Sequence, residues 1–189
     1  TGDYHVSNGV LTCPSGEILH RNEMARSLPH DVINALAAAA ITIEAGLANR
    51  NQVAQALRSF VNAPHRIEFV AESEGVRWFN DSKATSPHAS SVALNSFESI
   101  VLIAGGKNKD LDLSEMAKNA GKVKAVVAIG TAAKDIATAF SKVCEVKICS
   151  SMRDAVSCAS KFAASGDVVL LSPGCASYDW YKNYGERGT

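Results

Sequence analysis

Four short apolar runs alternate with helical patterns in the second half of the chain, and this alternation restricts the fold more than any other feature. The runs cover residues 100–104, 125–129, 146–148 and 168–171. Apolar residues at helical spacing lie beside them, over residues 88–95, 113–120, 132–142 and 152–164. Continuous apolar runs of this length suit parallel strands that are covered on both faces. We therefore expect a doubly wound, Rossmann-like α/β domain with a mostly parallel sheet and right-handed crossovers.

A β-hairpin is expected just before this alternation. Two β-like segments flank Glu74-Gly75, a pair that is typical of a hairpin turn. The second segment runs into a polar loop, Asn80–Thr85, and Ser86-Pro87 then predicts the start of a helix. An acid, a cation and two hydroxyls thus lie together where a strand gives way to a helix.

The first third of the chain has a different pattern. Short β-like pieces lie between glycines up to about residue 28, which predicts one or two hairpins. An Ala-rich helix is expected over residues 30–48, and a second helix from about 51 to 60. Asn62-Ala63-Pro64 interrupts the helical pattern, so we place a boundary there. It separates a hairpin-and-helix segment, 1–63, from the α/β domain, 64–189.

Charge and cysteine content exclude several classes of protein. Lys and Arg total 19, as do Asp and Glu, and this zero net charge argues against binding nucleic acid or a membrane surface through bulk charge. No apolar run reaches the roughly 18 residues of a membrane span, and the N-terminus lacks a signal-peptide pattern. The five cysteines show no zinc-binding spacing, and Cys144, Cys149 and Cys158 are expected to be buried thiols. We expect a cytoplasmic monomer with no metal bound by this chain.

Polar residues follow the predicted strands and would meet at one edge of a parallel sheet. They are Asp81, Lys83, Gly105, Gly106, Lys109, Gly130, Ser172 and Ser177. Open α/β sheets bind ligands outside the carboxyl ends of their strands, so the pattern predicts a binding site. Lys83 and Lys109 would face an anionic ligand, with Thr85 and Ser177 as hydroxyl donors. The alternative is that both lysines are solvated on the surface, as most lysines are.

Four stretches, in the same order, resemble the motifs of the Mur ligase family. Asn80–Thr85 resembles the signature loop of the branch that adds D-glutamate. The other stretches are 64–68, 102–110, and 170–179 followed by 186–188. The resemblance covers nearly all of the chain. It implies the C-terminal Rossmann-like domain of such a ligase over 64–189, and the last portion of its central ATP-binding domain over 1–63.

The resemblance also implies roles for individual residues. D-glutamate would be bound by Lys83, Thr85, Lys109, Ser177 and Tyr184. The residues near ATP would be Asn34, Arg66 and Asp81, and Arg187 would lie on the active-site face. On the residues alone, Asp81 and Arg66 could instead form a salt bridge or a helix cap. One departure is Asp31, which stands where the family's His-Asn-x-x-Asn motif has its first Asn.

The reaction implied by the resemblance joins D-glutamate to UDP-N-acetylmuramoyl-L-alanine through an acyl phosphate. It is an ATP-dependent, ADP-forming step of peptidoglycan precursor synthesis. The family keeps its phosphate loop, its Mg²⁺ ligands and an essential lysine in the central domain, and this sequence contains no G-x-x-x-x-G-K-[ST] loop. We therefore assign no catalytic residue to this chain. We expect ATP, Mg²⁺ and the N-terminal and central domains to complete the enzyme, and the chain alone to be inactive.

Two other functions stay open. One is a related ligase that adds L-lysine, diaminopimelate or the glutamates of folate. Those relatives tend to carry an Ala-His-Asn-Pro or Ala-His-Thr-Pro loop where this chain has Asp81–Thr85. The other is a non-catalytic α/β module that binds a ligand. A phosphate loop upstream in the parent gene would favour the enzyme.

Overall fold

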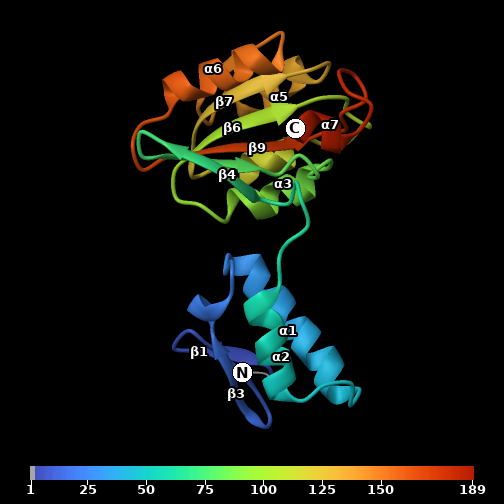
Figure 1. Cartoon of the computed structure of the whole chain (residues 1–189). Helices are drawn as coiled ribbons and strands as arrows, with labels where there is room; N and C mark the ends of the chain where they lie inside the picture. The colour runs from blue at the N-terminus through green and yellow to red at the C-terminus, as the bar shows by residue number, and fades with distance from the viewer. Residues whose placement is uncertain (1–2) are drawn as a thin grey trace. The chain divides into compact units, whose positions relative to one another are not determined.

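The computed structural model describes residues 3–189, which divide after Asn62 into an N-terminal unit and a C-terminal unit (Figure 1). The N-terminal unit has three strands, one short 3-10 helix and two α-helices. They are β1 (His5–Ser7), β2 (Val10–Cys13), β3 (Gly16–His20), η1 (Arg21–Glu23), α1 (Pro29–Glu44) and α2 (Arg50–Ser59). The strands form an antiparallel sheet in the order β1-β2-β3, which contains two hairpins where one or two were expected.

The helices of the N-terminal unit pack against this small sheet. Leu11 of β2 and Ala39 of α1 are fully buried in one apolar cluster, to which Val53 of α2 also belongs. Helix α1 ends at Glu44, earlier than the expected residue 48, because the chain turns at Gly46, which has a positive φ of 67°. Helix α2 begins where the Asn49 side chain accepts hydrogen bonds from two backbone amides of its first turn.

The C-terminal unit is built on a six-stranded sheet in the order β4-β5-β9-β6-β7-β8. Its strands are β4 (Glu68–Ser73), β5 (Val76–Asn80), β6 (Ile100–Gly105), β7 (Val123–Ile129), β8 (Glu145–Ile148) and β9 (Val168–Gly174). Its helices are α3 (Pro87–Leu94), α4 (Ser114–Lys118), α5 (Ala133–Phe140), α6 (Met152–Phe162) and α7 (Tyr184–Gly188). Only β4 runs antiparallel to its neighbour, so the expected mostly parallel sheet is confirmed.

Helices cover both faces of this sheet, which explains why its central strand β6 is apolar throughout. Val101 and Ile103 of β6 pack in one cluster with Ala155 and Ala159 of α6. Helix α3 lies on the opposite face (Figure 1), where it packs against α4, and α4 against α5. All six residues of β6 are buried, as expected for a strand covered on both sides. The doubly wound α/β architecture is therefore confirmed.

The hairpin formed by β4 and β5 carries the chain into the candidate site. Glu74 and Gly75 at its turn both have positive φ, 54° and 76°, the geometry that lets two-residue turns match the twist of paired strands. Strand β5 ends at Asn80, where the polar loop begins, and α3 starts after Ser86, whose hydroxyl accepts a hydrogen bond from the Ala89 amide. The expected hairpin, loop and helix start are all present.

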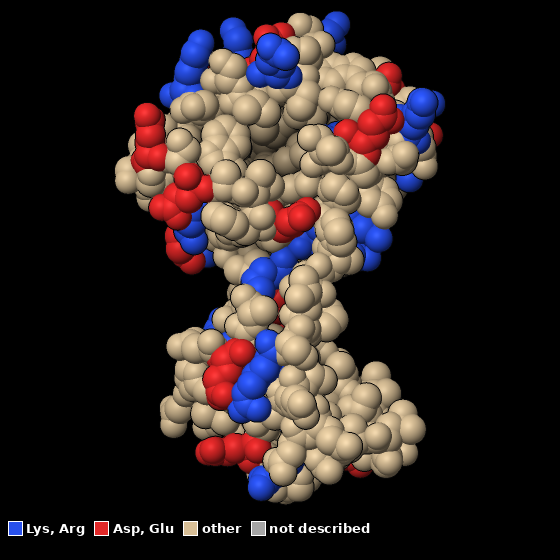
Figure 2. Space-filling model, viewed as in Figure 1, with Lys and Arg blue, Asp and Glu red and all other residues tan. Residues whose placement is uncertain are grey.

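Acidic and basic side chains both occur on the visible face of each unit (Figure 2). Within residues 3–189, no helix combines the length and the apolar character needed to cross a membrane.

Candidate active-site edge

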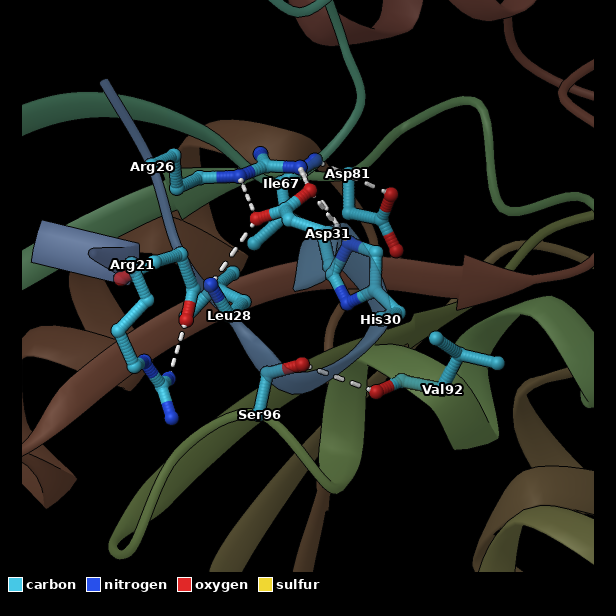
Figure 3. A network of polar contacts seen from close by, with 10 residues as sticks. Arg21, Arg26, Leu28, His30, Asp31, Ile67, Asp81, Val92 and Ser96 are labelled. Atoms are coloured by element: carbon cyan, nitrogen blue, oxygen red, sulfur yellow. Dashed lines mark hydrogen bonds and ion pairs between the residues drawn. The ribbon is translucent and has the colours of Figure 1, made fainter. Parts of the chain in front are cut away.

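The buried carboxylate of Asp81 holds the start of the polar loop. The Asp81 amide continues the pairing of β5 with β9 by donating to the Leu171 carbonyl at 2.7 Å. One carboxylate oxygen accepts a hydrogen bond from the Ile67 amide at 3.2 Å, which Figure 3 shows, and the other accepts from the Ser172 hydroxyl at 2.7 Å. Asp81 therefore joins the loop to β9 and to the segment that precedes β4.

A buried arginine from the end of the chain clamps the same loop. The Arg187 side chain is 4% exposed, and its guanidinium donates to the Ser82 hydroxyl, the Ser82 carbonyl and the Cys175 carbonyl at 3.0, 2.8 and 3.1 Å. Burial lowers the pKa of Arg187 to about 10, and the nearby Asp179 opposes part of that effect. Arg187 therefore remains protonated at neutral pH and brings α7, the loop and the segment after β9 together.

Lys83 directly follows Ser82, the residue that Arg187 binds, and its side chain points toward α7. Its ammonium nitrogen lies 5.1 Å from the centroid of the Tyr184 ring, within the range of a cation–π contact. The His65 ring packs edge-on against Tyr184, with the ring centroids 6.0 Å apart. Because the Ser82 hydroxyl also donates to the Tyr184 carbonyl at 2.7 Å, the loop and α7 hold Lys83 and Tyr184 side by side.

The ends of β6, β7 and β9 meet beside one another, as the sequence predicted. Lys107 and Ala176 exchange backbone hydrogen bonds of 2.8 and 3.0 Å, which ties the loop after β6 to the segment after β9. The Thr131 amide after β7 donates to the Asp179 carboxylate at 2.9 Å. The convergence of strand ends at one edge of the sheet is therefore confirmed.

The candidate ligand residues occupy different positions on this edge. Ser177 is 2% exposed and follows Ala176, whereas Lys109 lies on the surface two residues beyond Lys107. Thr85 is half-buried in the polar loop, and Arg66 is exposed just ahead of β4. The buried hydroxyl of Ser177 and the ammonium groups of Lys83 and Lys109, which follow different strands of one sheet, suit an anionic ligand.

Asn34 lies apart from these residues, on α1 of the N-terminal unit. It is exposed and borders a pocket of about 250 Å³, most of whose surface is apolar. The residues that line the pocket are Met24, Ala25, Arg26, Asp31, Asn34, Ala35, Ala38, Leu57, Phe60 and Asn62.

Asp31, the departure from the family motif, has a defined structural role beside this pocket (Figure 3). Its carboxylate accepts two hydrogen bonds of 2.7 Å from Arg26 and one of 3.1 Å from the Leu28 amide, and it lies 3.2 Å from the His30 ring. Burial raises the pKa of Asp31, but the hydrogen bonds from His30 and Arg26 outweigh burial and hold the pKa well below its usual value. The aspartate thus fixes the first turn of α1, on which Asn34 lies.

This pKa predicts a pH-dependent stability of the N-terminal unit. A carboxyl whose pKa is depressed by folding stabilises the fold above its unfolded pKa of about 3.9, and the stability is lost as the pH falls below that value. We therefore expect the α1 amide signals to disappear at lower urea concentration at pH 3 than at pH 7. Asp31→Asn should lower stability at pH 7 by about 1–3 kcal/mol and flatten the pH dependence.

The exposed Glu17→Gln in the same unit is the matched control, and it should change neither quantity. If Asp31→Asn kept the same pH dependence as the unchanged chain, the Arg26–Asp31 pair would not be its source.

Sequence reasoning named Asp81, Ser172 and Arg187, but it did not identify the contacts through which they hold the site in place. Ser82 is fully buried, and its partner Arg187 is 105 positions away in the chain. The Ser90 hydroxyl of α3 lies 3.0 Å from the Ser172 hydroxyl and donates a hydrogen bond of 3.1 Å to the Ser172 carbonyl, and nothing in its local sequence indicated these contacts. Among residues 3–189 no group of three or more His, Cys, Asp or Glu side chains could hold a metal ion.

Known proteins resemble this chain over most of its length. The curated relatives include UDP-N-acetylmuramoylalanine--D-glutamate ligases from Natranaerobius thermophilus, 43% identical over 98% of this chain, and from Pelotomaculum thermopropionicum, 45% identical over 97%. The chain spans 41% and 42% of the length of these two relatives. A solved structure of E. coli FolC in complex with DHPP and ADP shares the fold, with a TM-score of 0.66 and 21% identity over 90% of this chain and 42% of that one.

The family model described as "Mur ligase, glutamate ligase domain" matches residues 65–175, which include the polar loop and the strand ends that meet beside it. This match and the two relatives above show that the chain belongs to the Mur ligase family.

Proposed function

We propose that this chain is part of an ATP-dependent, ADP-forming amide ligase, and that the whole ligase adds D-glutamate to UDP-N-acetylmuramoyl-L-alanine. This chain would supply the D-glutamate site and part of the ATP site. The names of the curated relatives support this reaction, a step of peptidoglycan precursor synthesis. The observation that carries the proposal is Lys83, which is held beside Tyr184 by a loop that Arg187 and Asp81 fix in place.

D-glutamate has two carboxylates, and Lys83 and Lys109 each offer an ammonium group at the sheet edge. We infer that Lys83 and Lys109 pair with these carboxylates, while the hydroxyls of Thr85 and Ser177 donate hydrogen bonds to them. Tyr184 would border the ligand beside Lys83. Binding both carboxylates fixes the direction of the substrate amine, which must reach the acyl phosphate made from the other substrate with ATP, releasing ADP and phosphate. Because Lys83 and Lys109 come from different loops, a short monocarboxylate would engage only one of them.

The nucleotide assignment forms a second part of the proposal. Asn34 borders a mostly apolar pocket, the kind of surface that receives a planar base, and Arg66 is exposed just ahead of β4. Both carboxylate oxygens of Asp81 accept hydrogen bonds from the protein, so we infer that Asp81 acts on the nucleotide by fixing the loop. Residues 1–63 would be the last portion of the central domain. The other domains would complete the sites for ATP and Mg²⁺ in a cytoplasmic, monomeric enzyme.

Titration of the chain with D-glutamate, followed by NMR, tests the amino-acid site. Amide shifts are expected at residues 81–85, 105–109 and 172–184, and L-glutamate should cause weaker shifts. Lys83→Ala removes a charged hydrogen-bond donor, which is worth about 1.5–3 kcal/mol, so affinity should fall on the order of ten- to a hundred-fold.

Lys118→Ala, an exposed lysine on α4, is the matched control and should bind as the unchanged chain does. A preference for L-lysine would assign the chain to a different branch of the family. Shifts of equal size for all three amino acids, insensitive to Lys83→Ala, would contradict the proposed site.

A further inference from the structure

The C-terminal unit contains titratable side chains to which the proposed function assigns no role. Cys144, Cys149 and Cys158, which the sequence predicted as buried thiols, are only half-buried, so that prediction is wrong. They lie on or beside β8 and α6. His65, just ahead of β4, is also half-buried, but its backbone and side chain both contact the segments that hold Lys83.

The Asn80 side chain at the end of β5 can adopt only one orientation in its surroundings. It is 6% exposed, and its oxygen Oδ1 accepts a hydrogen bond of 3.0 Å from the Ser82 backbone amide, which can only donate. Its nitrogen Nδ2 donates a hydrogen bond of 2.9 Å to the Gly188 backbone carbonyl, which can only accept. Exchanging the two atoms would set donor against donor at Ser82 and acceptor against acceptor at Gly188. The backbone therefore fixes the orientation of the Asn80 amide.

This orientation determines which ring nitrogen of His65 carries the proton. His65 Nδ1 lies 2.8 Å from Asn80 Nδ2, which has a second N–H to donate. Nδ1 must therefore accept that hydrogen bond, which requires a neutral imidazole with its proton on Nε2. A positively charged imidazole would direct an N–H at the Asn80 N–H and lose the hydrogen bond.

His65 also contacts two of the residues proposed to bind D-glutamate. Its backbone carbonyl accepts a hydrogen bond of 3.1 Å from the Lys83 amide, and its ring packs edge-on against Tyr184, over which the Lys83 ammonium lies. Its φ of +62° is a left-handed conformation in which His, Asn and Asp occur more often than other residues that have a side chain. His65 thus links the segment before β4, the end of β5 and α7.

We propose that His65, in the neutral form with its proton on Nε2, is a positioning residue for the D-glutamate site. The inference rests on the proposed function for the identity of the ligand. His65 acts through Asn80 and Tyr184: the hydrogen bond to Nδ1 and the ring contact hold the end of β5 against α7, and so set Lys83 beside Tyr184. Protonation of the ring releases Asn80 and weakens binding of the amino acid.

The charged and titratable groups near His65 come from three elements. The Glu68 carboxylate of β4 accepts a hydrogen bond of 2.9 Å from the His65 amide, Lys83 lies in the loop after β5, and Tyr184 lies on α7. Histidine changes its charge between pH 5 and 8, whereas both carboxylates of D-glutamate stay ionised over that range. The affinity for D-glutamate should therefore fall as the pH is lowered from 8 to 6. If His65 acted on the ligand only through its charge, the affinity would rise instead.

Nitrogen-15 NMR of the histidine rings tests the protonation state in the full chain without any ligand. At pH 8 the His65 ring should show an unprotonated Nδ1 and a protonated Nε2, in a signal identified by its absence from His65→Asn. Asn80→Asp replaces the donor with a carboxylate oxygen, so the ring should then carry a proton on Nδ1. This response separates the network from the preference of a free imidazole. A proton on Nδ1 in the unchanged chain, or a ring that does not respond to Asn80→Asp, would overturn the inference.

Titration with D-glutamate measures the effect on the site. His65→Phe keeps a ring beside Tyr184 but offers no acceptor to Asn80, so the affinity at pH 8 should fall roughly five- to ten-fold. His65→Asn suits the left-handed backbone, offers a side-chain oxygen as acceptor and does not titrate, so it should retain most of the affinity and lose the pH dependence. His88→Asn, at an exposed position of α3, is the matched control and should keep the affinity and pH profile of the unchanged chain.

Two results of this titration would overturn the positioning role and leave the proposed function intact. They are equal affinities for His65→Phe and the unchanged chain at pH 8, and an affinity that rises as the pH is lowered. A chain that binds no D-glutamate at either pH would contradict the proposed function instead, while the ring signals would still decide the protonation state of His65.

Discussion

Replacing Arg187 with alanine is expected to lower the free energy of unfolding of the C-terminal unit by about 2–4 kcal/mol. The guanidinium is 4% exposed and makes three hydrogen bonds, two to Ser82 and one to Cys175. Alanine would leave the carbonyls of both residues without these donors in a buried region, and would leave a cavity as well. The polar loop would lose its attachment to α7.

Urea unfolding followed by tryptophan fluorescence measures this loss. Both tryptophans, Trp78 and Trp180, belong to the C-terminal unit, so the signal reports that unit alone. Arg187→Lys keeps a positive charge but loses the planar fork that reaches three acceptors at once, so it should show most of the destabilisation.

The exposed Lys182→Ala in the same terminal segment is the matched control and should change stability by less than about 0.5 kcal/mol. An Arg187→Ala chain with the same urea midpoint as Lys182→Ala would mean that these hydrogen bonds do not hold the fold together. D-glutamate binding gives a second readout, because Lys83 directly follows the residue that Arg187 clamps.

The architecture of the C-terminal unit could be predicted because its cause is local in sequence. A strand covered on both faces must be apolar at every position, as β6 is, and a helix between such strands must have an apolar side. The exact ends of the strands were harder to predict from the sequence. Strand β9 continues through Ser172, Pro173 and Gly174, because pairing with β6 extends to Gly174, and that pairing depends on a neighbour far away in the chain.

In the candidate site as well, some features could be predicted from the sequence and others could not. The sequence could identify Asp81 and Lys83, because parallel strands bring the residues that follow them to one edge. It could not show that Asp81 accepts from Ser172, or that Arg26 holds Asp31, because these contacts depend on side-chain packing between separate elements. Sequence thus predicts where the candidate site residues gather, while the contacts that fix their positions require the three-dimensional structure.

Gly106→Ala is expected to destabilise the C-terminal unit by about 3 kcal/mol or more and to disturb the site directly. Gly106 has a φ of +129°, which side chains rarely allow, and an added Cβ would lie 2.2 Å from the Ala176 carbonyl oxygen. The backbone cannot rotate away from this clash without breaking the hydrogen bonds of Gly106. The Gly106 amide donates a hydrogen bond of 3.0 Å to the Ile129 carbonyl. The Gly106 carbonyl accepts from the Ala132 amide at 2.8 Å and from the Thr131 hydroxyl at 3.1 Å.

Relief of this clash would push the loop after β6 away from the segment after β9, and so would separate Lys109 from Ser177. Weaker D-glutamate binding should therefore accompany the lower urea midpoint of tryptophan fluorescence. Gly121→Ala is the matched control, because an added Cβ there meets no atom within 4 Å, and it should stay within about 0.5 kcal/mol of the unchanged chain. Equal midpoints for the two variants would show that the close approach of Gly106 to Ala176 does not constrain this edge of the sheet.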